Sequence, residues 1–132
     1  MIARNVVTEF VEKVGPYSHI TEVNNIVSLS GIIAYDDISA DENSFASISS
    51  ETATCLSLIK KMLISVGLSI GDLTSVLIHM TDLSEFDKMN VVYRTFFQEG
   101  SEPSRTCVGV ANLLNGARIE ITCQAVRKEG YS

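Results

Sequence analysis

The feature that most constrains the fold is a long stripe of mostly apolar residues, spaced three and four apart, in the middle of the chain. It runs from about Ser44 to Val66 and consists of Phe45, Ile48, Thr52, Cys55, Ile59, Met62 and Val66. This spacing places the side chains on one face of an α-helix. Gly67 follows directly, where a left-handed residue suits a helix end. The sequence therefore predicts one long amphipathic helix.

A second helix and five strands are predicted around it. The helix begins at Ser84, with Asp87 placed as in a variant of the capping box, and its apolar face holds Phe86, Met89, Tyr93, Phe96 and Phe97. Strands are expected over 18–23, 26–30, 73–83, 105–113 and 117–126, with Asn24-Asn25 as a hairpin turn. The order β-β-α-β-α-β-β indicates a single α+β domain over residues 1–132.

The predicted helices cover one face of a mixed sheet, and the opposite face is expected to carry apolar residues as well. An apolar face that the monomer leaves uncovered favours self-association.

Composition argues against several classes of protein. The chain carries a net charge of −6, and its ten Lys and Arg residues are scattered, whereas nucleic-acid-binding proteins usually present a basic face. We therefore do not expect a nucleic acid as partner. No run of about 20 apolar residues and no signal-peptide pattern is found, so neither a membrane span nor secretion is expected. We expect a cytoplasmic location, and a mitochondrial one stays open.

The cysteines argue against a disulfide framework and against a zinc site. Cys55, Cys107 and Cys123 are odd in number and far apart in the sequence, which fits a reducing compartment. No C-x-x-C or H-x-x-x-H spacing occurs, so we expect no metal and no cofactor. His19 and His79 stand in no recognisable motif with a carboxylate or nucleophile, and we expect structural or exposed roles for both.

Two charged residues in the last two predicted strands are candidates for chemistry. Arg105 follows a Pro-Ser bend, and a guanidinium matches a carboxylate through paired hydrogen bonds. Glu120 lies between two isoleucines, and a carboxylate in a buried strand needs a partner or a function. Each also has an ordinary explanation, as a surface charge or as a residue at the rim of the sheet.

Strand periodicity assigns the neighbours of these residues to faces. Arg105, Cys107 and Gly109 are expected to point to the same side. In the last strand, one face is predicted to hold Ile119, Ile121, Cys123 and Ala125, and the other Arg118, Glu120, Thr122 and Gln124.

Five motifs in order give the sequence a specific resemblance. They are GPYS at 15–18, SLSG at 28–31, MNVVYRTFF at 89–97, PSRTCVGVANL at 103–113 and ARIEITCQAV at 117–126. Together they resemble the reactive intermediate deaminase family, also called Rid, YjgF or endoribonuclease L-PSP. The resemblance covers about Val14 to Lys128.

The resemblance implies a chorismate-mutase-like fold that assembles as a homotrimer around a central barrel, with clefts between neighbouring subunits. It implies that Arg105 holds a substrate carboxylate and that Glu120 orients or activates a water molecule. It also implies that Tyr17, Ser30, Gly31, Asn90 and Cys107 line the cleft. The implied substrates are 2-imino acids and their enamine tautomers, with 2-keto acids as products.

Two segments depart from the family pattern. IIAYDD follows Gly31, where the family has a glutamine and a proline, and Leu114 stands where a proline is usual. Both segments are expected to flank the cleft and to affect substrate preference.

The expected activity is hydrolytic deamination of 2-iminobutanoate and 2-iminopropanoate. Three alternatives stay open: an endoribonuclease or translation inhibitor, a module that binds small carboxylates without turnover, and a thiol enzyme that uses Cys107.

Overall fold

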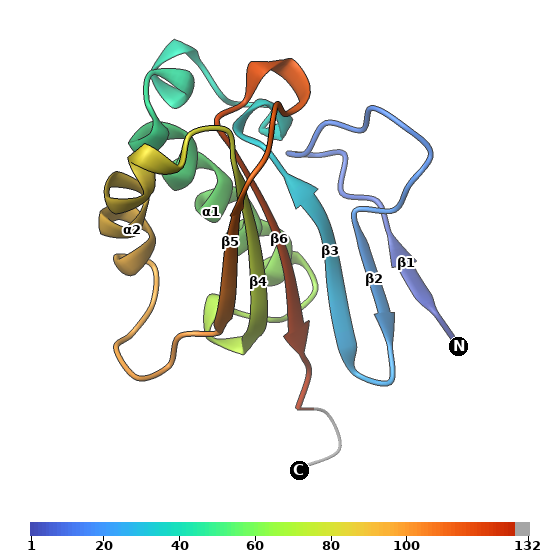
Figure 1. The fold of residues 1–132 in the computed structure, drawn as a ribbon. Helices are drawn as coiled ribbons and strands as arrows, with labels where there is room; N and C mark the ends of the chain where they lie inside the picture. The colour runs from blue at the N-terminus through green and yellow to red at the C-terminus, as the bar shows by residue number, and fades with distance from the viewer. Residues whose placement is uncertain (129–132) are drawn as a thin grey trace.

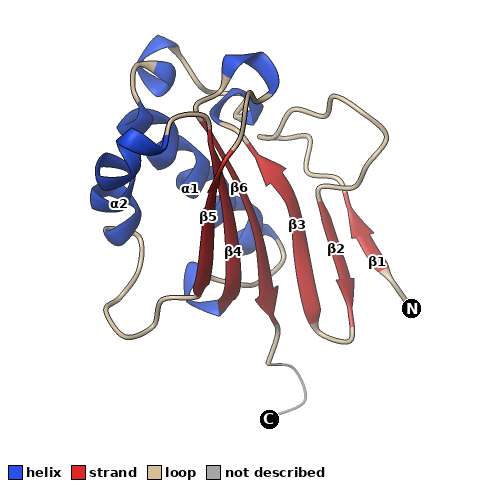
Figure 2. Cartoon of the chain, viewed as in Figure 1, coloured by secondary structure: helices blue, strands red, loops and turns tan. Residues whose placement is uncertain are grey.

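Two α-helices pack on one side of a six-stranded sheet in the computed structural model, which describes residues 1–128 (Figures 1 and 2). The strands are β1 (Ala3–Asn5), β2 (Ile20–Val23), β3 (Ile26–Ile32), β4 (Leu73–Met80), β5 (Ser104–Gly109) and β6 (Ile119–Val126); the helices are α1 (Ile48–Ser65) and α2 (Phe86–Arg94). The order across the sheet is β1-β2-β3-β6-β4-β5, and of these pairs only β4 and β5 are parallel. The predicted α+β class with a mixed sheet is confirmed.

The predicted element order misses the first strand. β1 pairs antiparallel with β2, so the chain reads β-β-β-α-β-α-β-β. The strand is three residues long and exposed throughout, and its sequence ARN has no apolar alternation for a pattern search to detect. The turn between β2 and β3 is as predicted, since Asn24 and Asn25 have φ of 50° and 65°.

The long helix forms with the predicted stripe but begins later than expected. Ser47 caps it by accepting a hydrogen bond from the Ser50 amide at 3.1 Å, and a separate 3-10 turn, Glu42–Phe45, precedes it. The stripe from Ile48 to Met62 is buried. Gly67 follows the helix with φ of 79°, as its position predicts.

The second helix also begins later than predicted. A 3-10 turn over Leu83–Glu85 comes first, and Asp82 caps it by accepting a hydrogen bond from the Ser84 amide at 2.9 Å. The expected capping role of Asp87 is therefore wrong. Phe96 and Phe97 lie beyond the end of α2 at Arg94 but still pack against the core.

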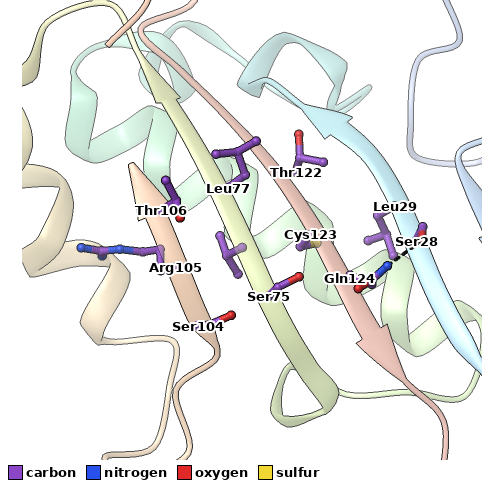
Figure 3. Close-up of a pocket in the computed structure, with 11 residues that line it drawn as sticks. Ser28, Leu29, Ser75, Leu77, Ser104, Arg105, Thr106, Thr122, Cys123 and Gln124 are labelled. Carbon is purple, nitrogen blue, oxygen red and sulfur yellow. Dashed lines mark hydrogen bonds between the residues drawn. The ribbon is translucent and has the colours of Figure 1, made fainter. Parts of the chain in front are cut away.

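The two faces of the sheet differ in their residues. Val76, Ile78 and Met80 of β4 point into the core beneath the helices, and so do alternate residues of β6. The other face, called the open face here, carries partly exposed Leu77 and Val108 among many hydroxyl groups. A shallow groove of about 510 Å³ on this face includes Ser28, Ser75, Ser104, Thr106, Thr122 and Gln124 (Figure 3). Val23, Ile26 and Val126 are also exposed on this face, so the predicted apolar residues are present there alongside the hydroxyl groups.

An ion pair between the buried Glu51 and the partly exposed Arg118 joins the long helix to the start of β6. Glu51 is fully buried, accepts a hydrogen bond from the Arg118 amide at 2.9 Å, and pairs with Nη1 of the Arg118 guanidinium. The same guanidinium donates to the Phe45 carbonyl at 2.8 Å. The predicted place of Arg118 on the Glu120 face is therefore wrong, because it lies just before β6 and turns toward α1.

Candidate functional site

Arg105 lies on the edge strand β5 and points toward α2. It stands opposite Val76 in the β4–β5 register, and Val76 faces the helices, so the same face presents Arg105 to α2 (Figure 3). Nη1 donates a hydrogen bond to Asn90 Oδ1 at 2.7 Å. The guanidinium carbon lies 4.7 Å from the centre of the Tyr93 ring and 5.4 Å from that of Phe86. Cation–π contacts of this kind fix the orientation of a guanidinium.

The hollow beside this arginine, called the arginine hollow, has a volume of about 340 Å³. It is lined by Asn90, Tyr93, Arg94, Glu102, Pro103 and Arg105. Within residues 1–128, Asn90 is the only group that accepts a hydrogen bond from Arg105. The other N–H groups of the guanidinium are therefore left for a ligand. The arrangement suits a small carboxylate that binds through two oxygens.

Tyr93 forms the floor beneath the guanidinium. Burial raises the pKa of its hydroxyl to about 12, against a smaller lowering by Arg105. The hydroxyl oxygen is buried and has no hydrogen-bond partner among the described residues. Tyr93 is therefore a neutral aromatic platform at physiological pH.

Cys107 follows Arg105 on the same side of β5, as the strand pattern predicts. It stands opposite Ile78 and is half-buried. Burial raises the pKa of its thiol, and the nearby Arg105 offsets only part of that effect. A thiol of this kind is a poor nucleophile at neutral pH, because the thiolate is the reactive form.

Glu120 lies on β6 and belongs to a second hollow, called the glutamate hollow, of about 200 Å³. Its lining residues are Val14, Tyr17, Ser30, Gly31, Ile33, Asp36, Leu114 and Glu120. The sequence-predicted residues Tyr17, Ser30, Gly31 and Glu120 are thus brought together. Leu114 and the segment after Gly31 also line this hollow, where the departures from the family pattern are expected to lie.

Gly31 closely approaches the side chain of Glu120. A Cβ atom at this position would lie 3.0 Å from Glu120 Cδ and 3.0 Å from Thr122 Oγ1. Ser30 is held nearby, because its hydroxyl donates to the Ser18 carbonyl at 2.8 Å. The Tyr17 hydroxyl accepts a weak hydrogen bond from the Val14 amide at 3.4 Å.

Asp36 is a second carboxylate in the glutamate hollow that sequence reasoning missed. Burial raises the pKa of Asp36, and the charge of Glu120 raises it further. A hydrogen bond from the Ile33 amide at 2.9 Å partly offsets both effects. The spacing of Asp36 three residues after Ile33 is the local signal for this backbone contact.

The histidines have different environments. His19 is buried and holds the N-terminal segment: the Val7 amide donates to Nδ1 at 2.7 Å, and Nε2 lies 3.1 Å from the Glu12 carbonyl. This confirms a structural role. His79 lies against Glu120, with Nδ1 3.5 Å from Oε1. No sequence motif links these two residues, which come together only through the pairing of β4 and β6.

The predicted site residues therefore form two groups within one chain. Arg105 and Asn90 meet in the arginine hollow, and Tyr17, Ser30, Gly31 and Glu120 meet in the other hollow. Cys107 lies on the same face of β5 as Arg105 but lines neither hollow. Among residues 1–128, no group of three His, Cys, Asp or Glu side chains is arranged to hold a metal ion. No helix in that range is long and apolar enough to cross a membrane.

Comparisons with known proteins agree on one family. Residues 8–127 match the family model described as Endoribonuclease L-PSP. The chain is 30% identical to the 2-iminobutanoate/2-iminopropanoate deaminase of Escherichia coli, over 87% of this chain and 90% of that protein.

Solved structures show the same relationship. Escherichia coli TdcF with bound serine has a TM-score of 0.80 and 30% identity, covering 95% of this chain and 98% of that one. RidA from the Antarctic bacterium Psychrobacter has a TM-score of 0.84 and 26% identity, covering 95% and 99%. The chain belongs to the Rid family, whose model carries the older name Endoribonuclease L-PSP.

Proposed function

We propose that the protein hydrolyses small 2-imino acids, such as 2-iminobutanoate and 2-iminopropanoate, to 2-keto acids and ammonia. The observation that carries the proposal is the half-buried Arg105, held by Asn90 and Tyr93 with donors left for a carboxylate. A relative with 30% identity is named as a deaminase of these two imino acids, and another has been solved with serine bound. Serine, like the proposed substrates, carries a carboxylate beside a nitrogen-bearing carbon.

We further propose that the working site forms between two copies of the chain. Arg105 and Glu120 lie in separate hollows of one chain, so a substrate that contacts both needs the arginine hollow of one copy to face the glutamate hollow of another. A homotrimer in which the open faces of the sheets line a central barrel would repeat this contact three times. The exposed apolar side chains of the open face would be covered by the neighbouring copies in such an assembly.

In this site, Arg105 binds the substrate carboxylate and so fixes the imine carbon. Fixing the reactants lowers the barrier by removing the entropy cost of their encounter. Glu120 of the neighbouring copy accepts a proton from a water molecule as its oxygen bonds to the imine carbon. Glu120 passes this proton to the imine nitrogen as the C=N double bond becomes a single bond, and the carbon then holds one hydroxyl and one amino group.

The second half of the reaction moves the hydroxyl proton. Glu120 takes this proton as the ketone forms and delivers it to the amino nitrogen, so that the C–N bond breaks and ammonia leaves. The products are a 2-keto acid and ammonia, so one imine and one water are consumed in balance. Cys107 contributes a wall of the site and no covalent bond.

A coupled assay tests the proposal. Threonine dehydratase generates 2-iminobutanoate in place, and the protein is expected to speed its loss. Arg105→Ala and Glu120→Ala are each expected to reduce the acceleration at least tenfold, in line with lost positioning and lost proton transfer. Cys107→Ser is expected to keep most of the activity, which separates this reaction from thiol catalysis. Binding of 2-ketobutanoate without any acceleration would instead identify a binding module.

A further inference from the structure

His79 and Glu120 are directly paired across the antiparallel β4–β6 ladder, and both side chains project from the open face. Nδ1 of the imidazole lies 3.5 Å from Oε1 of the carboxylate. The side chains are 25% and 30% exposed, so both keep some contact with solvent while the atoms between them are shielded. Pairs directly opposite in a ladder have their Cβ atoms within about 5.5 Å of each other, which keeps the two groups together.

The Nδ1 atom itself is buried and has no hydrogen-bond partner among residues 1–128. A buried polar atom without a hydrogen bond costs folding free energy, so we expect Nδ1 to donate to the nearby Glu120 Oε1. The distance of 3.5 Å is longer than a normal N–H···O hydrogen bond. Catalytic hydrogen bonds are often long in ligand-free structures and tighten when substrate binds.

The two oxygens of Glu120 have different surroundings. Oε1 faces His79, whereas Oε2 lies on the side of Gly31, 3.1 Å from where a Cβ of that residue would stand. Gly31 lines the glutamate hollow. One oxygen is therefore available to the imidazole while the other stays next to the hollow.

We propose that His79 is a positioning residue for Glu120, donating its Nδ1 proton to Oε1 so that Oε2 is directed at the reacting water. The inference rests on the proposed imine hydrolysis. His79 keeps its own proton throughout: Oε2 takes a proton from water and returns it to the leaving nitrogen. The donated hydrogen bond stabilises the carboxylate form, which is the form that accepts a proton.

The presence of Asp36 gives a reason for a hydrogen-bond donor next to Glu120. It is the other carboxylate of the glutamate hollow, and two negative charges in one small hollow disfavour each other. A hydrogen-bond donor on the far oxygen of Glu120 counters that repulsion without occupying the hollow.

Three variants of His79 separate a donor at Nδ1 from other contributions of the ring. His79→Asn places an amide N–H near the Nδ1 position, His79→Gln places one near Nε2, and His79→Phe keeps a ring without a donor. We expect His79→Phe to lower kcat about tenfold with KM unchanged, the size of one hydrogen bond to a charged group. His79→Asn is expected to recover most of kcat, and His79→Gln to behave like His79→Phe.

The proposal is overturned if all three variants keep the wild-type kcat, if they change KM alone, or if Asn and Gln reduce kcat equally. Thermal unfolding of each variant shows whether a loss of activity is a loss of fold.

A measurement without substrate keeps this inference separate from the proposed function. The position of the ring proton of neutral His79 is read by ¹⁵N NMR of the imidazole nitrogens, since it depends on the hydrogen bond that the ring makes. We expect the proton on Nδ1 in the wild type and a move toward Nε2 in Glu120→Ala. A wild-type proton on Nε2 overturns the pairing. A wild type without turnover, but with the proton on Nδ1, contradicts the deaminase proposal and supports the pairing.

Discussion

Arg105 and Glu120 lie on opposite faces of one sheet, on the two strands that flank β4. Arg105 stands opposite Val76, which faces the helices, and Glu120 stands opposite His79, which faces away from them. Within one copy the two residues line separate hollows. This separation is the reason for proposing a working site between two copies of the chain.

Replacing Arg105 with lysine tests whether the planar guanidinium is needed, because the positive charge is kept. Arg105→Lys keeps a cation but loses the paired hydrogen bonds and the stacking on Tyr93. We expect KM for 2-iminobutanoate to rise about tenfold, roughly the 1.4 kcal/mol of one lost hydrogen bond to a charged group. Lys88→Ala, an exposed residue on the same helix as Asn90, is the control and should leave KM unchanged. An Arg105→Lys variant with wild-type KM would argue against carboxylate binding here.

Adding one methyl group at Gly31 is expected to displace Glu120. The new Cβ in Gly31→Ala would lie 3.0 Å from Glu120 Cδ, closer than ordinary van der Waals contact. We expect kcat to fall about tenfold or more, because a small misplacement of a catalytic group is costly. Gly71→Ala is the matched control, since the nearest atom to its new Cβ is 3.6 Å away. Equal activity in the two variants would contradict the role of this contact.

The raised pKa of Asp36 predicts a pH-dependent gain in stability on its replacement. Because burial raises this pKa above its ordinary value of 3.8, the folded state binds the proton more tightly than the unfolded state. Ionisation of Asp36 therefore weakens folding as the pH rises through the raised value. Asp36→Asn keeps an acceptor for the Ile33 amide and should increase the free energy of unfolding at pH 7.

The same variant should match the wild type well below pH 3.8, where the carboxyl is neutral in both states. Urea unfolding at several pH values checks this, at one fixed protein concentration because assembly adds to apparent stability. A loss of stability at pH 7 would show that the hydrogen bond from Ile33 outweighs the cost of burial.

The ion pair between the buried Glu51 and the partly exposed Arg118 predicts coupling between the two residues. Arg118→Met leaves the fully buried Glu51 carboxylate without its cation, and we expect a loss of about 3 kcal/mol in the free energy of unfolding. Glu51→Leu removes the buried charge together with the acceptor of the Arg118 amide. The double variant should lose less than the sum of the two single variants, and strict additivity would contradict the coupling.

The sequence predicts local features well and tertiary neighbours poorly. The stripe of α1, the Asn24-Asn25 turn and the common side of Arg105 and Cys107 follow from periodicity and turn chemistry. β1 is missed because its three exposed residues have no pattern of their own.

The candidate site shows the same division. Motifs identify Arg105, Glu120 and their neighbours, whereas Asp36 and His79 join Glu120 only through the loop fold and the strand register. Arg118 is assigned to the wrong face because strand alternation does not extend past the first residue of β6. Contacts between residues far apart in the chain are not encoded in any local spacing.

The most direct test of a site shared between copies mixes two variants that are each inactive. Arg105→Ala and Glu120→Ala subunits are co-expressed, so that mixed assemblies form, and turnover of 2-iminobutanoate is measured. A shared site predicts recovery of about a quarter of the wild-type activity at equal amounts, since that share of random contacts joins an intact Arg105 to an intact Glu120. Mixed assemblies that stay as inactive as either variant alone would contradict the account.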